Sequence, residues 1–169
     1  MSKRQPGSLA TIGYEGAALE EFIATLREAG IQRLLDVREL PLSRRKGFSK
    51  TAIAVALSNA GIEYVHLRGL GDPKPGREAA RSGEMALFRK IFGNHMRTPK
   101  AKADLALAAH LVTEGSTCLM CYEREHTDCH RSIVADAISD IVPVKIRHLK
   151  VASASSKPSV RKAPALECA

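Results

Sequence analysis

Short apolar runs alternate with amphipathic stretches along most of the chain, and this alternation restricts the fold more than any other feature. Apolar runs end near Tyr14, Val37, Leu67 and Cys121, and helical spacing of apolar residues follows each of them. The resulting order, β-α-β-α-β-α-α-β-α-β, is typical of α/β proteins. We therefore predict a single domain with a mainly parallel β-sheet of about five strands and helices on both faces.

Glycine and proline indicate where the predicted elements begin and end. Gly30 and Gly61 follow the first two helices, as helix-capping glycines do. Thr98 and Pro99 have the order of an N-cap residue and a first-turn proline. Residues 69–83, rich in glycine and proline, are predicted to form a long loop. Residues 144–149 alternate apolar and polar side chains, as an edge strand does.

Composition divides the chain into three parts. The 169 residues are 44% apolar, which suits one packed domain over residues 8–149. Residues 1–7 are predicted to be a flexible N-terminus, and residues 150–169, rich in Ala, Ser, Lys and Pro, a disordered basic tail. The sequence has no apolar run of about 20 residues and no signal-peptide pattern. We expect a cytoplasmic protein with no membrane partner.

The chain is basic, with a formal net charge of +8 and a pI near 9.6. This charge favours an anionic partner, such as a nucleotide or nucleic acid. A mildly basic protein with no such partner remains an equal alternative, because charge alone does not separate the two. The sequence does not indicate an oligomeric state.

Polar residues follow the predicted strands, where ligands of parallel sheets usually bind. Asp36 interrupts the second apolar run, and a buried carboxylate there needs a partner. Arg38 would point to the same face two residues later. The pair is either structural or catalytic, and both interpretations stay open. Other candidates after the strands are Ser43, Arg44, Lys46, His66, Gly71, Cys121 and Glu123.

The basic loop Ser43–Gly47 has a composition that suits phosphate. Arginine offers a planar fork of donors, and Gly47 allows close approach of the backbone. Phe48 is a candidate for stacking on a base. The alternative is an ordinary solvated loop.

The stretch Cys118–Ser132 is the densest group of reactive residue types and allows three interpretations. In the first, which we favour, a helix capped by Asp128 begins with Cys129, His130 and Arg131. An anion and a thiolate are both stabilised at such a helix start. Glu123 would then be the general acid or base.

The second interpretation is a metal site formed by Cys121, His126, Cys129 and His130. Adjacent residues on a helix diverge by about 100°, which makes joint ligation by Cys129 and His130 awkward. We therefore expect neither a metal nor a cofactor. The third interpretation is packing, which fits Cys118 best. Cys118 and Arg124 have the spacing of cysteine phosphatases, but Cys118 lies inside the predicted strand, so we exclude that class.

Several motifs occur in a fixed order, and together they resemble one family. They are Thr11-Ile-Gly-Tyr-Glu-Gly16, Leu35-Asp-Val-Arg38, Pro41-x-Ser43-Arg44, Tyr64-Val-His-Leu67, Leu70-Gly71-x-Pro73-Lys74, Cys121-x-Glu123 and Cys129-His-Arg131. Over about residues 8–149 the chain resembles the bacterial and archaeal proteins grouped as domain of unknown function 488. The resemblance implies an α/β fold and no established reaction. Asp72 stands where many relatives have a second glycine.

These observations favour an enzyme that acts on a phosphate-bearing substrate, a nucleotide or nucleic acid. Arg38, Arg44 and Arg131 would hold the anion. Glu123 and Asp36 would transfer protons, and Cys121 or Cys129 would be the reactive thiol. The alternative is a non-catalytic nucleic-acid-binding module that uses the basic loop and tail.

Overall fold

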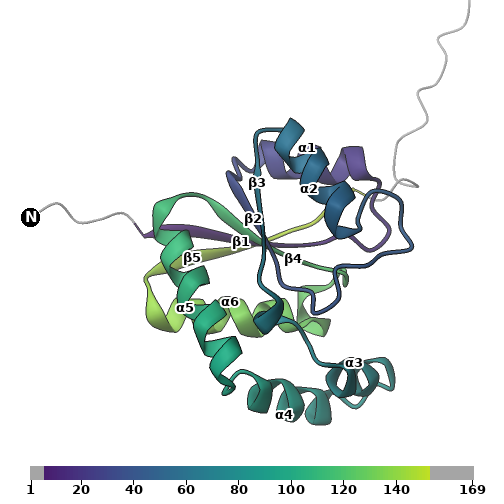
Figure 1. The fold of residues 1–169 in the computed structure, drawn as a ribbon, viewed down its shortest axis with the longest axis vertical. Helices are drawn as coiled ribbons and strands as arrows, with labels where there is room; N and C mark the ends of the chain where they lie inside the picture. Colours follow the sequence, from purple (N-terminus) through teal and green to yellow (C-terminus); the bar gives the residue numbers. More distant parts are fainter. Residues whose placement is uncertain (1–5, 153–169) are drawn as a thin grey trace, which may run out of the picture.

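The fold is a parallel β-sheet with helices on both faces (Figure 1). The structure is a computed structural model that describes residues 6–152. Within that range the strands lie in the order β3-β2-β4-β1-β5, and every adjacent pair is parallel. The strands are β1 (Gly7–Gly13), β2 (Arg33–Asp36), β3 (Glu63–His66), β4 (Thr117–Cys121) and β5 (Val144–Leu149). The predicted α/β fold class is therefore confirmed.

Each face of the sheet is covered by helices from a different part of the chain (Figure 1). One face carries α1 (Leu19–Glu28) and α2 (Lys50–Asn59). The other carries α5 (Pro99–Glu114) and α6 (His130–Ile141), with α3 (Lys74–Arg81) and α4 (Met85–His95) beyond them. The predicted flexible N-terminus and basic tail fall largely on residues outside the described range.

Alternation along β4 divides its side chains between two apolar cores. Cys118 and Met120 pack with α1 and α2, whereas Leu119 and Cys121 pack with α5 and α6. Cys118 is fully buried, as the packing interpretation predicted. The two cysteines of this strand therefore lie on opposite faces of the sheet. Among the described residues, no helix combines the length and apolar character needed to cross a membrane.

The boundary predictions are mostly confirmed. Gly30 and Gly61 have φ values of +71° and +74° just after α1 and α2, the left-handed backbone that favours glycine. Thr98 caps α5 and accepts a hydrogen bond from the backbone of Ala101. β5 lies at one end of the sheet, as its alternating pattern predicted.

Two local predictions are wrong. The predicted loop over residues 69–83 contains α3, whose buried face consists of Gly76 and Ala79. Such small side chains leave no apolar periodicity to recognise. Asp128 does not cap α6, because it lies in the 3₁₀ turn His126–Asp128, and Cys129 is the N-cap residue.

Candidate functional site

A pocket of about 1110 Å³ lies at the carboxyl ends of the strands, where a parallel sheet usually binds ligands. Its walls come from the segments after β1, β2 and β4, from the start of α6 and from α3. Of the predicted site residues, the lining contains Arg38, Ser43, Arg44, Cys121, Glu123, Cys129 and His130. The lining does not contain Asp36, Lys46, His66, Gly71 or Arg131.

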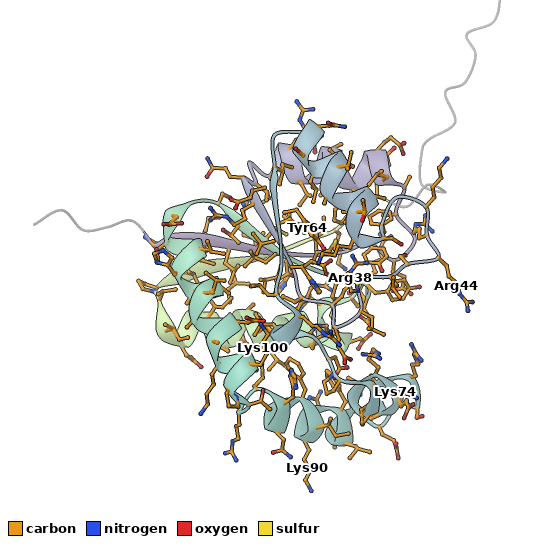
Figure 2. The ribbon with its side chains drawn as sticks, in the orientation of Figure 1. Arg38, Arg44, Tyr64, Lys74, Lys90 and Lys100 are labelled. Atoms are coloured by element: carbon orange, nitrogen blue, oxygen red, sulfur yellow. A yellow bond between two sulfur atoms is a disulfide. The ribbon has the colours of Figure 1, made fainter. Side chains whose placement is uncertain are left out.

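Asp36 and Arg38 form the buried pair that the strand spacing predicted. The guanidinium Nε and Nη2 donate to the two carboxylate oxygens of Asp36 at 2.9 and 2.7 Å. Tyr64 donates its hydroxyl to the same carboxylate at 2.6 Å. Burial by itself lowers the pKa of Arg38, but the hydrogen bonds and charge of Asp36 raise it overall. Figure 2 shows Arg38 and Tyr64 in the interior of the molecule.

The remaining donor of Arg38 holds the segment after β2. Its Nη1 donates to the Tyr14 hydroxyl at 3.1 Å and to the Phe48 carbonyl at 2.8 Å. Phe48 is fully buried and stacks on Tyr14, with ring centroids 4.6 Å apart. The prediction that Phe48 stacks on a nucleic-acid base is therefore wrong, because no base can reach a ring enclosed in the core.

Arg131 is fully buried and binds the backbone of the turn between β4 and α6. Its Nη2 donates to the Arg124 carbonyl at 3.1 Å, and its Nη1 donates to the Glu123 carbonyl. Nε donates to the Thr11 hydroxyl at 3.2 Å. Nη1 also lies 3.4 Å from Cys121 Sγ. This guanidinium shapes the turn from behind the pocket wall.

His66 and Gly71 also position the segment after β2. His66 Nε2 donates to the Arg38 carbonyl at 2.8 Å. A Cβ atom on Gly71 would lie 2.3 Å from the backbone nitrogen of Glu39, so only glycine fits this close approach. Lys46 is exposed on the basic loop.

Cys121, Cys129 and His130 form a buried group that we call the sulfur cluster. Each residue offers one ligand atom, a cysteine sulfur or a histidine ring nitrogen, and these three atoms all lie within 4.8 Å of one another. The two cysteines are joined by a disulfide bond, with Cα atoms 7.5 Å apart. The reactive thiol that the sequence predicted therefore requires the reduced protein.

His130 completes the sulfur cluster through its Nδ1 atom, which lies 3.7 Å from Cys129 Sγ. Its Nε2 donates to the Val37 carbonyl at 2.6 Å. Burial lowers the pKa of His130 to about 4, so the imidazole is neutral at pH 7.

The expected divergence of Cys129 and His130 does not occur. Cys129 has extended backbone angles, φ −131° and ψ 144°, because it is the N-cap residue and not part of α6. The helical separation of about 100° therefore does not apply to this pair. His126, by contrast, stacks on His148 at 3.5 Å and lies 3.2 Å from the Ser132 hydroxyl.

Glu123 borders the sulfur cluster on the pocket side. One carboxylate oxygen lies 3.2 Å from Cys121 Sγ. Burial raises the pKa of Glu123, although its own backbone N–H and the charge of Arg131 oppose the shift. A Cβ atom on Gly13 would lie 1.8 Å from the Glu123 carbonyl oxygen, so the end of β1 touches this turn directly.

Comparison with known proteins assigns the family. A family model described as "Domain of unknown function DUF488" matches residues 18–138. The chain belongs to the DUF488 family. No curated protein and no solved structure matched it. The DUF488 match includes β2, β4 and the sulfur cluster, whereas Tyr14 and Gly16 of the pocket precede it.

The lining of the DUF488 pocket contains five arginines and four carboxylates, the latter being Glu39, Asp72, Glu123 and Asp128. Arg38 pairs with Asp36, and Arg77 pairs with Glu39. Three further arginines of the lining form no ion pair within 4.0 Å among the described residues; they are Arg44, Arg45 and Arg81. The charge of Arg81 nevertheless acts on the Glu123 carboxyl and favours its ionised form. Figure 2 shows Arg44 extending outward from its loop.

Asp72, Arg77 and Arg81 are pocket residues that sequence reasoning missed. They lie on or just before α3, which the sequence presented as a loop. Asp72 is buried, and its Oδ1 has no hydrogen-bond partner among the described residues. Burial raises the pKa of Asp72 to about 7, against the charge of Arg77. The sequence contains one sign that position 72 is special: Asp72 stands in the motif Leu70-Gly71-x-Pro73-Lys74 where many relatives have a second glycine.

Proposed function

We propose that this protein is an enzyme that acts on a phosphate-bearing substrate, a nucleotide or nucleic acid, in the pocket at the carboxyl ends of the strands. One observation carries the proposal. Arginines that form no ion pair within the described range line a pocket whose wall also contains Glu123 and the sulfur cluster. An anion in this pocket would meet both arginine side chains and reactive groups.

Arg44, Arg45 and Arg81 are the anion-binding residues of the proposal. Each lines the pocket, and the Arg45 Nε also donates to the Ala17 carbonyl, which fixes that side chain. Arginine binds phosphate oxygens through paired, charge-assisted hydrogen bonds. Arg38 and Arg131 act differently in this arrangement, because their guanidinium groups bind protein partners and shape the walls.

Glu123 is the proton-transfer residue of the proposal. Its partly buried carboxyl lines the pocket, and its raised pKa brings it closer to neutrality, where general acids and bases work best. Asp36 is enclosed by Arg38 and Tyr64, so it orients the segment after β2 instead of reaching the substrate.

Binding of mononucleotides and short single strands to the full chain tests the anion site. We expect Arg81→Gln and Arg44→Gln each to weaken binding at least about tenfold, since a hydrogen bond to a charged group contributes about 1.5–3 kcal/mol. Arg89→Gln is the matched control, because Arg89 is exposed on α4 and outside the lining. Equal affinities for all four proteins would overturn the anion site.

Turnover tests the enzyme assignment separately. Products formed from a mixture of nucleotides and oligonucleotides are identified by mass spectrometry. We expect Glu123→Gln to keep substrate binding and lose about 10²–10⁴-fold in turnover, the usual contribution of a general acid or base. Unchanged turnover in this variant would remove Glu123 from the mechanism.

The second candidate function is a non-catalytic nucleic-acid-binding module. The observation that favours it is the exposure of Arg44 and Lys46 on the basic loop. Such a module would show a steep salt dependence of affinity and would be indifferent to Glu123→Gln. The cytoplasmic location expected from the sequence is consistent with either function and belongs to the proposal.

A further inference from the structure

The sulfur cluster contains the donor set of a zinc site. Cys121 and Cys129 supply sulfur, and His130 supplies Nδ1, all within 4.8 Å of one another and all buried. Two thiolates and an imidazole are ligands that select Zn²⁺ among the common divalent cations. The three residues come from the end of β4 and the start of α6, so the sheet and helix fix their positions.

The distances suit ligation of one ion. Sulfur and nitrogen ligands of a tetrahedral Zn²⁺ lie about 3.6 Å apart, given bonds of about 2.3 and 2.0–2.1 Å. The Cys129 Sγ–His130 Nδ1 distance is 3.7 Å. The Cα atoms of Cys121 and Cys129 are 7.5 Å apart, which leaves room for two separate thiolates on either side of an ion.

The surroundings of His130 prepare its Nδ1 for a metal. Because Nε2 donates to the Val37 carbonyl at 2.6 Å, the hydrogen of the neutral ring is on Nε2 and the Nδ1 lone pair faces Cys129. A ligating histidine usually gives its second ring N–H to a carbonyl or carboxylate in this way. Phe92 packs edge-on against the ring at 5.3 Å and helps to fix its plane.

We propose that the reduced protein binds one Zn²⁺ through Cys121 Sγ, Cys129 Sγ and His130 Nδ1, with the fourth position facing the pocket. All three residues line that pocket, together with Glu123. Three protein ligands and one open position are the arrangement of catalytic zinc sites. The site thus places a Lewis acid where the phosphate-bearing substrate would bind.

Zinc and the disulfide exclude each other, because both use the same two sulfur atoms. A phosphine reductant opens the bond: the phosphine takes oxygen from water and becomes a phosphine oxide, and the two sulfurs become thiols. Each thiol then releases one proton when Zn²⁺ binds, so metal binding itself involves no change of oxidation state.

Metal analysis of the full chain tests the proposal. The protein is reduced with phosphine, loaded with Zn²⁺ and freed of excess metal, and we expect one zinc per chain. Cys121→Ser, Cys129→Ser and His130→Ala should each weaken zinc binding at least about a hundredfold, because loss of a residue that only supports a ligand already costs about 10–100-fold. Cys118→Ser, Cys168→Ser and His126→Ala are the controls and should keep the metal. The unreduced protein should bind none.

Cobalt substitution gives a readout that does not depend on the variants folding. Co²⁺ in the reduced wild-type protein should show sulfur-to-cobalt charge transfer and the intense visible bands of tetrahedral Co²⁺. A spectrum without charge transfer overturns the proposal, as does equal retention of zinc by the Cys121 and Cys129 variants. Circular dichroism of each variant confirms its fold.

The zinc ion would lie in the proposed active site, so its catalytic role rests on the proposed function. Zinc binding itself is measured without turnover. Glu123→Gln separates the two, because the proposal gives Glu123 no bond to zinc: its carboxylate is not among the ligand atoms that all lie within 4.8 Å of one another. Zinc retained without turnover in this variant supports both ideas. If the protein binds zinc but acts on no phosphate-bearing compound, the zinc site stands and the proposed function is wrong.

Discussion

At the scale of the residue, the buried ion pair between Asp36 and Arg38 gives the clearest prediction. Asp36→Asn removes the carboxylate and leaves the Arg38 guanidinium buried without its counter-ion. Loss of one partner of a buried pair costs about 3–5 kcal/mol of the free energy of unfolding. Urea denaturation of the variant and the wild type measures this difference.

An exposed pair on the same sheet provides the control for Asp36. Arg33 and Glu63 join β2 to β3 at 2.7 Å, but the Glu63 side chain is 56% exposed. Glu63→Gln should therefore cost less than about 1 kcal/mol. Similar losses in the two variants would contradict the buried-pair account.

Asp72 predicts a pH dependence of stability. Its pKa is about 7 in the folded protein, against an ordinary value of 3.8, because burial disfavours the charged form. The charges that face it are Arg77, Glu123 and Glu39. At pH 3 the carboxyl is protonated in both states and no stability is lost. As the pH rises from about 4 to 7, the unfolded chain ionises first, so the carboxyl destabilises the fold increasingly.

Asp72→Asn removes that pH dependence. We expect the variant to gain stability relative to the wild type as the pH rises from 4 to 8, with the smallest difference at the acidic end. Denaturation midpoints across this range measure the change. A constant difference between the two proteins would show that Asp72 ionises normally in the fold.

Single residues were predictable where strand geometry alone determined the contact. Arg38 meets Asp36 because residues two apart share one face of a strand. The partners of Arg131 were not predictable, because they are backbone carbonyls of a turn whose path the sequence does not specify. Phe48 was misjudged for the same reason: its enclosure by Tyr14 depends on how a loop folds back.

At the scale of the element, the end of β1 is fitted against the turn that carries Glu123. Gly13→Ala would place a Cβ atom 1.8 Å from the Glu123 carbonyl oxygen, which is backbone and cannot rotate away. Overpacking of this kind costs about 1–3 kcal/mol. Thermal and urea unfolding measure the loss, and the shifted turn should also weaken zinc binding.

Gly93→Ala is the matched control. Gly93 lies inside α4, and a Cβ atom there would meet nothing within 4 Å. Alanine should stabilise this helix by about 0.5–1 kcal/mol. Equal effects at the two glycines would show that the turn yields to the added methyl group.

Elements were predictable where large apolar side chains repeat, and not where small ones do. The faces of α1 and α2 follow from residues such as Phe22 and Leu57. α3 buries only Gly76 and Ala79, so its glycine- and proline-rich sequence suggested a loop. The start of α6 was placed one residue too early, and this error hid the convergence of Cys129 and His130.

At the scale of the whole molecule, parallel topology explains why the candidate residues converge. Strands that all run in one direction end at one edge of the sheet, so Cys121 and the segment after β2 meet there although about 80 residues separate them. The alternating sequence therefore predicted the edge of the sheet at which the pocket lies. It could not predict the wall from α3, nor which arginines are already paired with carboxylates.

Both the pocket and the C-terminal tail contain basic residues, and the last prediction concerns which of the two binds the anion. If the pocket holds the anion, replacing Lys157, Arg161 and Lys162 together by serine should leave mononucleotide affinity within about twofold. Only the binding of longer single strands would then depend less on salt. The slope of log affinity against log salt concentration would become shallower by about 0.7 for each phosphate contact that is lost. Fluorescence anisotropy across salt concentrations measures both. If mononucleotide affinity fell with the tail and resisted Arg81→Gln, the chain would bind anions through its basic segments, and the non-catalytic module would replace the enzyme.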